Sequence, residues 1–201
     1  MTPRTALSIA GSDPSGGAGI QADLKTFAAL GVHGMAALAG LTVQNTQGVR
    51  AASPIDPGFV VAQVEAVLDD IEVHATKLGM LTNARIAEAV ADLITARRAD
   101  FGFLVLDPVM VATSGDRLLA DEAVEVVRTR LLPLADLITP NVPETAVLAV
   151  PDAEWGRRVV LFAASGDLAG WREALASALP RTWLPRQLVV TPIPRTPGGK
   201  P

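Results

Sequence analysis

The fold is decided by residues 6–24, which read ALSIAGSDPSGGAGIQADL. An apolar run with strand character (6–10) passes into a glycine-rich loop (11–19), and a segment with helical period follows at once. A strand, a glycine-rich turn and a helix start form a pocket where backbone N–H groups approach a polar ligand closely, because glycines carry no Cβ and tolerate positive φ. The stretch therefore predicts a ligand site at the end of a strand, with a merely tight strand-to-helix turn as the alternative.

The loop does not follow the common nucleotide-binding patterns. It lacks the Gly-x-x-x-x-Gly-Lys-Ser/Thr order of a Walker A loop. Gly17, Gly19 and Ala22 fit a loose form of the dinucleotide fingerprint, but no acid stands about 20 residues further on at a second strand end. A dinucleotide site is therefore only weakly supported.

Strand-like and helix-like segments alternate along the chain. Short apolar runs bounded by Gly, Asp or Pro, at 103–106 and 136–139, have the character of buried strands. Apolar side chains recur at helical spacing in three segments, 20–28, 59–71 (with Gln63 as the polar exception) and 86–94. We therefore predict an α/β fold with a mostly parallel sheet, in which ligands bind at the carboxyl ends of the strands.

The glycine-rich loop is the first of five motifs in order. The others are TVQNTQGV (42–49), KLGML (77–81), DPVMV with SGD (107–111 and 114–116) and TPN-x-x-E (139–144). This series closely resembles the bacterial hydroxymethylpyrimidine and phosphomethylpyrimidine kinases over residues 6–148. The resemblance implies the ribokinase-like fold, with three layers in the order α/β/α, together with the use of ATP and Mg²⁺ and a role in thiamine biosynthesis.

By the same resemblance, the aminopyrimidine substrate binds near five residues, Gly11, Ala18, Asp23, Gln44 and Met80. A flat heteroaromatic ring needs apolar contact on its faces, which Met80 and Ala18 can supply. It also needs paired donors and acceptors on its edge, which the Gln44 amide can supply. Taken alone, Met80 is typical of core filling and Gln44 of a turn after a strand, and both interpretations stay open.

Two acids at strand ends suit a metal and phosphate site. Asp107 ends an apolar strand before Pro108, where its carboxylate can help to hold Mg²⁺ directly or through water. The resemblance gives Glu144 the same role and orients Asn141 toward the nucleotide phosphates. A helix N-cap at Asn141 and a first-turn acid at Glu144 are the structural alternative, supported by Pro143 at an early helical position.

Phosphoryl transfer also needs donors for the charge on the transferred group and a base near the attacking hydroxyl. The resemblance places both at a Gly-Thr-Gly-x turn beyond Glu144, and residues 145–201 contain no such turn. The catalytic residue is therefore unknown, and we expect a C-terminally truncated ribokinase-like fold. Two functions are considered: ATP-dependent phosphorylation of 4-amino-5-hydroxymethyl-2-methylpyrimidine or its monophosphate, and a non-catalytic pyrimidine-binding remnant or decayed gene fusion.

The composition changes near residue 150. Residues 1–149 carry a net charge of −7 and residues 150–201 a net charge of +3, and all the tryptophans lie in the second part. The end of the chain, PRTPGGK (194–200), resembles the small C-terminal domain of adenylate-forming acyl-CoA ligases. We predict an incomplete kinase domain over 1–149 and a foreign α+β fragment over 150–201, with Lys200 as an alternative adenylation lysine or part of a flexible charged end.

The composition also narrows the partners and the compartment. The chain has no cysteine, which excludes disulfides, thiolate metal sites and a cysteine nucleophile and favours the cytoplasm. A net charge of −4 provides no basic surface for nucleic acid, and no leader-like segment or membrane-length apolar run predicts secretion or membrane insertion. His33 and His74 stand in no metal-ligand spacing. The expected partners are the small pyrimidine and, by resemblance, a second copy in a homodimer.

Overall fold

The computed structural model describes the chain over the ranges 3–108, 121–139, 145–152, 156–163, 167–176 and 187–190. The chain divides into two compact units, Met1–Ala135 and Asp136–Pro201, each of which is described by itself. No helix within the described ranges combines the length and the apolar character needed to cross a membrane.

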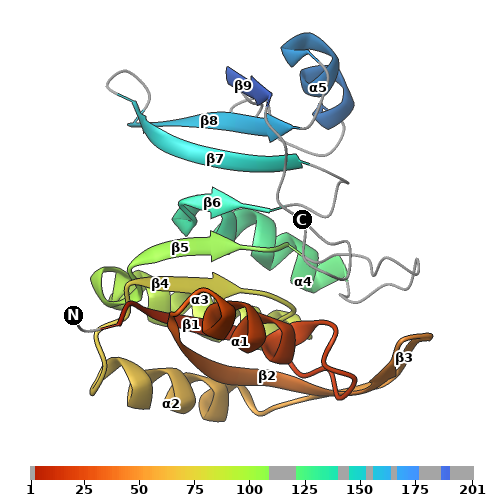
Figure 1. Ribbon diagram of the computed structural model, residues 1–201, viewed down its shortest axis with the longest axis vertical. Coiled ribbons are helices and arrows are strands. Elements are labelled where there is room, and N and C mark those ends of the chain that lie inside the picture. The colour runs from red at the N-terminus through yellow and green to blue at the C-terminus, as the bar shows by residue number, and fades with distance from the viewer. Residues whose placement is uncertain are drawn as a thin grey trace. The chain divides into compact units, whose positions relative to one another are not determined.

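The first unit is built on a mostly parallel sheet with strand order β3-β2-β1-β4-β5 (Figure 1). β1 pairs in parallel with β2 and β4, and β4 pairs in parallel with β5. β2 and β3 form an antiparallel hairpin. The strands are β1 Thr5–Gly11, β2 His33–Asn45, β3 Gly48–Pro54, β4 Ala75–Leu78 and β5 Phe103–Leu106. This arrangement confirms the predicted α/β class.

Helices cover both faces of this sheet. In Figure 1, α1 lies on the near side of the sheet and α3 on the far side. Parallel strands require such crossovers, because their connections must return along the length of the sheet. The helices are α1 Gly19–Ala29, α2 Pro57–Leu68, α3 Ala84–Ala96 and α4 Asp121–Val126, followed or accompanied by short helical turns at Arg98–Phe101, Val127–Leu131 and Leu132–Leu134.

Side-chain caps set where α2 and α3 begin. Asp56 accepts a hydrogen bond from the Phe59 N–H at 3.1 Å, and Asn83 accepts one from the Ile86 N–H at 3.0 Å. Phe59 belongs to the predicted apolar face of its helix but is 62% exposed, whereas Val60 is fully buried. The helical period therefore predicted the helix and most of its inward face, including the fully buried Val64, but wrongly placed Phe59 on that face.

The apolar core lies mainly on the side of the sheet away from α1. Ser8 of β1 faces α1, so Leu7 and Ile9 face the other side by alternation, and both are fully buried. Burying one such side chain contributes about 1.5–3 kcal/mol. α3 carries a full buried face, whereas α1 has no fully buried residue. The buried residues of α3 are Ile86, Ala87, Val90, Ala91, Leu93 and Ile94.

The second unit contains the strand order β6-β7-β8-β9. β7 pairs antiparallel with β6 and β8, and β8 pairs in parallel with β9. The elements are β6 Leu137–Ile138, β7 Thr145–Asp152, β8 Gly156–Ala163, α5 Leu168–Leu175 and β9 Gln187–Val190. β6 confirms the strand predicted at 136–139. The proposed boundary between residues 149 and 150 falls within β7, and the assignment of 1–149 and 150–201 as separate domains stays a prediction.

Candidate substrate-binding site

The carboxyl ends of three parallel strands meet at one edge of the first sheet. β1 and β4 are in register at Ile9 and Leu78, so that Gly11 and Met80 both stand two residues beyond the same pair. Asp107 follows β5 beside them, and its backbone N–H donates to the Leu78 carbonyl at 2.9 Å. We use the name carboxyl-edge site for the predicted substrate residues, Gly11, Ala18, Asp23, Gln44 and Met80.

Gly11 and Met80 are in direct contact at this edge. The Gly11 N–H donates to the Met80 carbonyl at 3.1 Å. A Cβ on Gly11 would lie 2.6 Å from Met80 Cε, which is closer than two carbon atoms approach when they are not bonded to each other. The missing side chain of Gly11 therefore gives the Met80 thioether room to lie over the end of β1. Met80 is half-buried, which leaves polarizable surface for contact with a ring face.

β2 reverses its buried face at Gly40. From Met35 to Ala39 the odd-numbered positions of β2 are buried. After Gly40, Leu41 and Val43 are 50% and 58% exposed, while the even-numbered positions turn inward. A one-residue bulge, where β2 pairs with the end of β1, causes the reversal. Gln44 therefore lies on the same side of β2 as Gly40, which packs against Thr82 in the loop after β4.

The Gln44 amide keeps capacity for a ligand. The Thr42 hydroxyl lies 2.8 Å from the Ser12 carbonyl and 3.3 Å from Gln44 Oε1. A hydroxyl has one proton, so the shorter bond to Ser12 uses it. Within the described part of the chain, the half-buried Gln44 side chain makes no other hydrogen bond. Its amide can therefore donate and accept along the edge of a heteroaromatic ring.

One buried carboxylate holds the glycine-rich loop in shape. Asp13 is 2% exposed and accepts hydrogen bonds from the Ser15 N–H at 2.9 Å, the Ser15 hydroxyl at 2.7 Å and the Gly17 N–H at 3.1 Å. Burial raises the pKa of Asp13, but the hydrogen bonds from Ser15, from the backbone of Ala18 and from Gly17 outweigh it and hold the pKa below its ordinary value. The loop amides thus bind the protein's own carboxylate, whereas those of a phosphate-binding nest face the ligand.

α1 begins directly against the end of β1. Gly19, its first residue, has a φ of +56°, and a Cβ there would overlap the Gly11 carbonyl. Glycine meets both demands, because it has no Cβ and adopts positive φ freely. Ala18 occupies the N-cap position just before it, without a side-chain hydrogen bond. The close approach of Gly19 to Gly11 therefore places Ala18 one residue away from a contact with the end of β1, and its role in binding stays a prediction.

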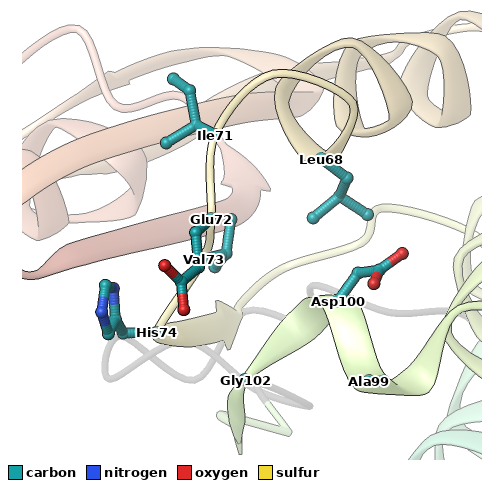
Figure 2. A pocket seen from close by; sticks show the side chains of 8 residues that line it. All are labelled: Leu68, Ile71, Glu72, Val73, His74, Ala99, Asp100 and Gly102. Atoms are coloured by element: carbon teal, nitrogen blue, oxygen red, sulfur yellow. The ribbon is translucent and has the colours of Figure 1, made fainter.

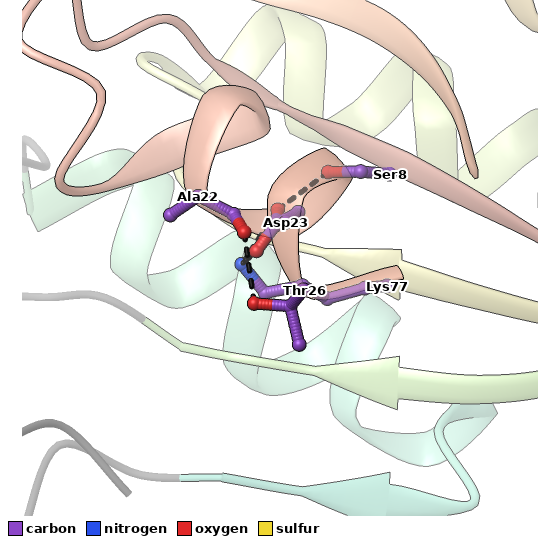
Figure 3. A network of polar contacts seen from close by, with 5 residues as sticks. All are labelled: Ser8, Ala22, Asp23, Thr26 and Lys77. Carbon is purple, nitrogen blue, oxygen red and sulfur yellow. Dashed lines mark hydrogen bonds and ion pairs between the residues drawn. The ribbon is translucent and has the colours of Figure 1, made fainter. Parts of the chain in front are cut away.

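Asp23 is bound to the sheet by two partners (Figure 3). Its carboxylate accepts a hydrogen bond from the Ser8 hydroxyl at 2.6 Å and pairs with Lys77 Nζ at 2.9 and 3.0 Å. The side chains of Asp23 and Lys77 are 13% and 26% exposed. These bonds fix the second turn of α1 to β1 and β4. A substrate contact at Asp23 would involve an ion-paired carboxylate, and this contact stays a prediction.

The predicted metal and phosphate ligands are described only at Asp107. Its side chain is half-buried at the carboxyl edge, and an oxygen ligand of this type suits Mg²⁺. Asn141, Glu144 and Lys200 lie outside the described residues. Over the described ranges, no three His, Asp or Glu side chains come close enough together to hold a metal ion. The fit of Mg²⁺ therefore rests on Asp107 alone.

Two described hollows lie away from Gly11 and Met80. One cavity of about 340 Å³ lies at the amino edge of the sheet, lined by Leu68, Ile71, Glu72, Val73, His74, Ala99, Asp100 and Gly102 (Figure 2). A second, of about 270 Å³, lies at the hairpin turn just beyond Gln44, lined by Asn45, Gln47, Gly48, Val49 and Arg50. The first contains no residue of the carboxyl-edge site, and we do not assign the substrate to it.

Three residues of this region had no assigned role in the sequence. Asp13, Thr42 and Lys77 lay inside the recognised motifs, but the structure shows what they bind. For Asp13 a local signal existed, because an Asp two residues before Ser15 can hydrogen-bond the backbone of its own turn. Lys77 gave no such signal, since its partner Asp23 is 54 residues away.

The sequence of this chain is similar to those of phosphomethylpyrimidine kinases. A family model described as "Phosphomethylpyrimidine kinase" matches residues 13–159. The hydroxymethylpyrimidine/phosphomethylpyrimidine kinase of Escherichia coli (strain K12) is 53% identical over 143 residues, covering 71% of this chain and 53% of that protein. Its counterpart from Streptomyces coelicolor is 51% identical over 148 residues, covering 74% and 54%. The chain spans about half the length of the curated relatives it matches.

Solved structures show the same likeness. The crystal structure of a phosphomethylpyrimidine kinase from Clostridium difficile 630 matches with a TM-score of 0.65 and 45% identity, covering 70% of this chain and 60% of that one. The pyridoxal kinase from Staphylococcus aureus in complex with AMP-PCP and pyridoxal matches with a TM-score of 0.59 and 33% identity, covering 70% and 49%. These matches confirm the ribokinase-like fold expected from the motif series.

Proposed function

Because the chain belongs to the phosphomethylpyrimidine kinase family, we propose that its carboxyl-edge site binds 4-amino-5-hydroxymethyl-2-methylpyrimidine or the monophosphate of this alcohol. The observation that carries the proposal is the contact of Gly11 with Met80, beside a strand whose bulge turns Gln44 to the side of Gly40. This arrangement offers a thioether for the face of a ring and an amide for its edge, which a flat aminopyrimidine requires.

The proposed reaction transfers the γ-phosphoryl group of ATP to this substrate. The hydroxymethyl oxygen, or a phosphate oxygen of the monophosphate, bonds to the γ-phosphorus while the bond between that phosphorus and the departing oxygen of ADP breaks. When the alcohol is the substrate, its hydroxyl proton passes to a base. Mg²⁺ would spread the phosphate charge, with Asp107 and Glu144 as its proposed ligands and Asn141 near the phosphates. We extend the proposal to thiamine biosynthesis and a homodimer, as the resemblance implies, and to a cytoplasmic location, which the absence of cysteine favours.

ADP release tests the proposed kinase activity. The purified chain is incubated with Mg-ATP and hydroxymethylpyrimidine, and a Gln44→Ala variant purified identically reports contaminating host kinase. We expect pyrimidine-dependent ADP release from the wild type and a rate about ten-fold or more lower in Gln44→Ala at subsaturating pyrimidine, the order expected for lost hydrogen bonds to the ligand. ADP release at the same pyrimidine-independent background rate in both proteins would show that this chain does not catalyse the transfer.

A second function, pyrimidine binding without phosphoryl transfer, is favoured by one observation. The residues after Glu144 contain no Gly-Thr-Gly-x turn. The family resemblance places the anion hole and the catalytic residue at such a turn, where backbone N–H groups stabilise developing charge. Under this function the wild type binds hydroxymethylpyrimidine more tightly than Gln44→Ala, and both release ADP only at the background rate. Pyrimidine-dependent ADP release above this background would rule the second function out.

A further inference from the structure

β2 contains a bulge where it passes the end of β1. Ala10 pairs with Leu38, whereas the next residue, Gly11, pairs with Gly40, so that Ala39 is an extra residue in β2. Side chains alternate along a strand, so one extra residue exchanges the two faces for everything beyond it. Ala39 and Gly40 are accordingly both buried although they are adjacent. The orientation of the rest of β2 depends on this bulge.

Gln63 of α2 binds the backbone at the bulge. Its Oε1 accepts a hydrogen bond from the Leu38 N–H at 3.0 Å, and its Nε2 donates to the Leu38 carbonyl at 3.1 Å. The adjacent Ala39 carbonyl accepts a hydrogen bond from the Ile55 N–H at 3.2 Å. In a regular strand, the carbonyls of adjacent residues point to opposite sides. Here two adjacent carbonyls are both bound by groups outside β1, and the Gln63 amide takes the place of a peptide group.

Leu38 lies in a part of β2 whose backbone is not hydrogen-bonded by β3. β3 pairs with β2 only between Gly40 and Asn45. Unpaired backbone groups at a sheet edge leave the register of a strand weakly specified. Gln63 supplies both an acceptor and a donor, the pair that one peptide group presents. The need for a donor and an acceptor at Leu38 explains why Gln63 is the polar residue on an otherwise apolar helical face.

We propose that Gln63 is a positioning residue for the carboxyl-edge site. By holding the bulge, it turns Gln44 to the side of β2 on which Gly40 packs against Thr82. Without the bulge, alternation would turn Gln44 to the opposite side, the side that Leu38 occupies. Gln63 acts through the backbone and not by touching the ligand. The effect on ligand binding rests on the proposed function, whereas the effect on the bulge does not.

The test compares Gln63→Met with Val64→Ala. Methionine has the length of glutamine but lacks the amide donor and acceptor. Val64 is fully buried on the same helix, and its truncation removes packing while leaving the Gln63 amide in place. Hydroxymethylpyrimidine is titrated into each protein by calorimetry. In the free proteins, the nuclear Overhauser effect between Gly40 Hα and the Thr82 methyl reports the bulge, because these two residues are in contact.

We expect Gln63→Met to bind hydroxymethylpyrimidine about ten-fold or more weakly than wild type and to lose the Gly40–Thr82 Overhauser effect. Val64→Ala should lower the melting temperature but retain the wild-type affinity and the Gly40–Thr82 Overhauser effect. Gln63→Glu accepts from the Leu38 N–H but cannot donate to its carbonyl, so it should show the same losses, and it replaces the methionine variant if that protein does not fold. Wild-type affinity with an intact Overhauser effect in the Gln63 variants would overturn the proposal.

The two readouts separate this inference from the proposed function. If the wild type binds no pyrimidine, the proposed function fails, and the Overhauser effect alone decides whether Gln63 holds the bulge. Its loss in the Gln63 variants then supports the inference, and its persistence overturns it. Equal weakening of binding by Gln63→Met and Val64→Ala would reveal a general loss of stability and would overturn the positioning role.

Discussion

The Met80 thioether lies over the end of β1 because Gly11 has no side chain. A Cβ on Gly11 would meet Met80 Cε at 2.6 Å, while the Gly11 N–H is already bonded to the Met80 carbonyl. Gly11 therefore contacts both the backbone carbonyl and the side chain of Met80. The present position of the Met80 methyl group therefore depends on the absence of a side chain at Gly11.

We expect Gly11→Ala to weaken hydroxymethylpyrimidine binding. The new methyl must displace the end of the flexible Met80 side chain, so the affinity should fall about ten-fold, whereas the free energy of unfolding should fall by less than about 1.5 kcal/mol. Calorimetric titration and urea unfolding measure the two effects. Gly17→Ala is the matched control, because a Cβ on Gly17 makes an ordinary contact at 3.7 Å with Asp13. An equal loss of affinity in both variants would contradict the role of Gly11.

Asp13→Asn should destabilise the chain in a pH-dependent way. An asparagine NH₂ faces loop N–H groups that also donate, so a buried donor loses its acceptor and the free energy of unfolding at about pH 7 should fall by about 1–3 kcal/mol. In the folded chain, the pKa of Asp13 lies below its ordinary value of 3.8. Its carboxylate therefore stabilises the fold above that value, and the contribution is lost as the pH falls through the folded pKa.

Urea unfolding of wild type and Asp13→Asn over a series of pH values checks this sign. The difference in unfolding free energy should be constant above about pH 5 and shrink below about pH 4. A difference that grows on acidification would show that the protonated form of Asp13 is the one that the fold favours.

The motifs of the sequence indicated candidate site residues but not the contacts that hold them in place. Gly11, Ala18 and Met80 were candidates because each belongs to a recognisable motif. The structure places Gly11 against Met80 and against Gly19, the residue after Ala18, and the role of these residues in binding stays a prediction. The reason for glycine at residue 11 could not be predicted, because it depends on the register of Ile9 with Leu78. That register is set by packing between distant strands.

At the scale of elements, the unit formed by β1, the glycine-rich loop and α1 could be predicted because its parts are consecutive in the chain. The bulge of β2 could not, since it exists only through pairing with β1 and α2. The polar exception at Gln63 was the one local sign of it. The ion pair that attaches α1 to the sheet could likewise not be predicted from the sequence, because Asp23 and Lys77 belong to different motifs.

A double-mutant cycle measures how strongly the Asp23–Lys77 pair holds α1. The two alanine variants and the double variant are compared by urea unfolding, and we expect a coupling energy of about 1–3 kcal/mol because both side chains are largely shielded from water. The control is the Glu125–Arg128 pair, whose side chains are 56% and 51% exposed. Its coupling should stay below about 0.5 kcal/mol. A coupling for Asp23–Lys77 no larger than that of the control would contradict this role.

At the scale of the whole molecule, three descriptions of the chain place its boundaries differently. The charge changes sign near residue 150, the fold divides between Ala135 and Asp136, and the family model matches 13–159. β7 crosses residue 150 and pairs with β8 along its length, and the assignment of 1–149 and 150–201 as separate domains stays a prediction. The α/β class could be predicted, since strand and helix periods are local. The likeness of residues 150–201 to an acyl-CoA ligase fragment stays a prediction.

The central claim is that the carboxyl-edge site binds hydroxymethylpyrimidine through Gln44. Calorimetric titration of this alcohol into the wild-type chain and into Gln44→Ala tests it most directly, with urea unfolding to show that both proteins are equally folded. We expect saturable binding to the wild type and binding about ten-fold or more weaker to Gln44→Ala. No binding to the folded wild type, or equal affinity in the two proteins, would contradict the claim.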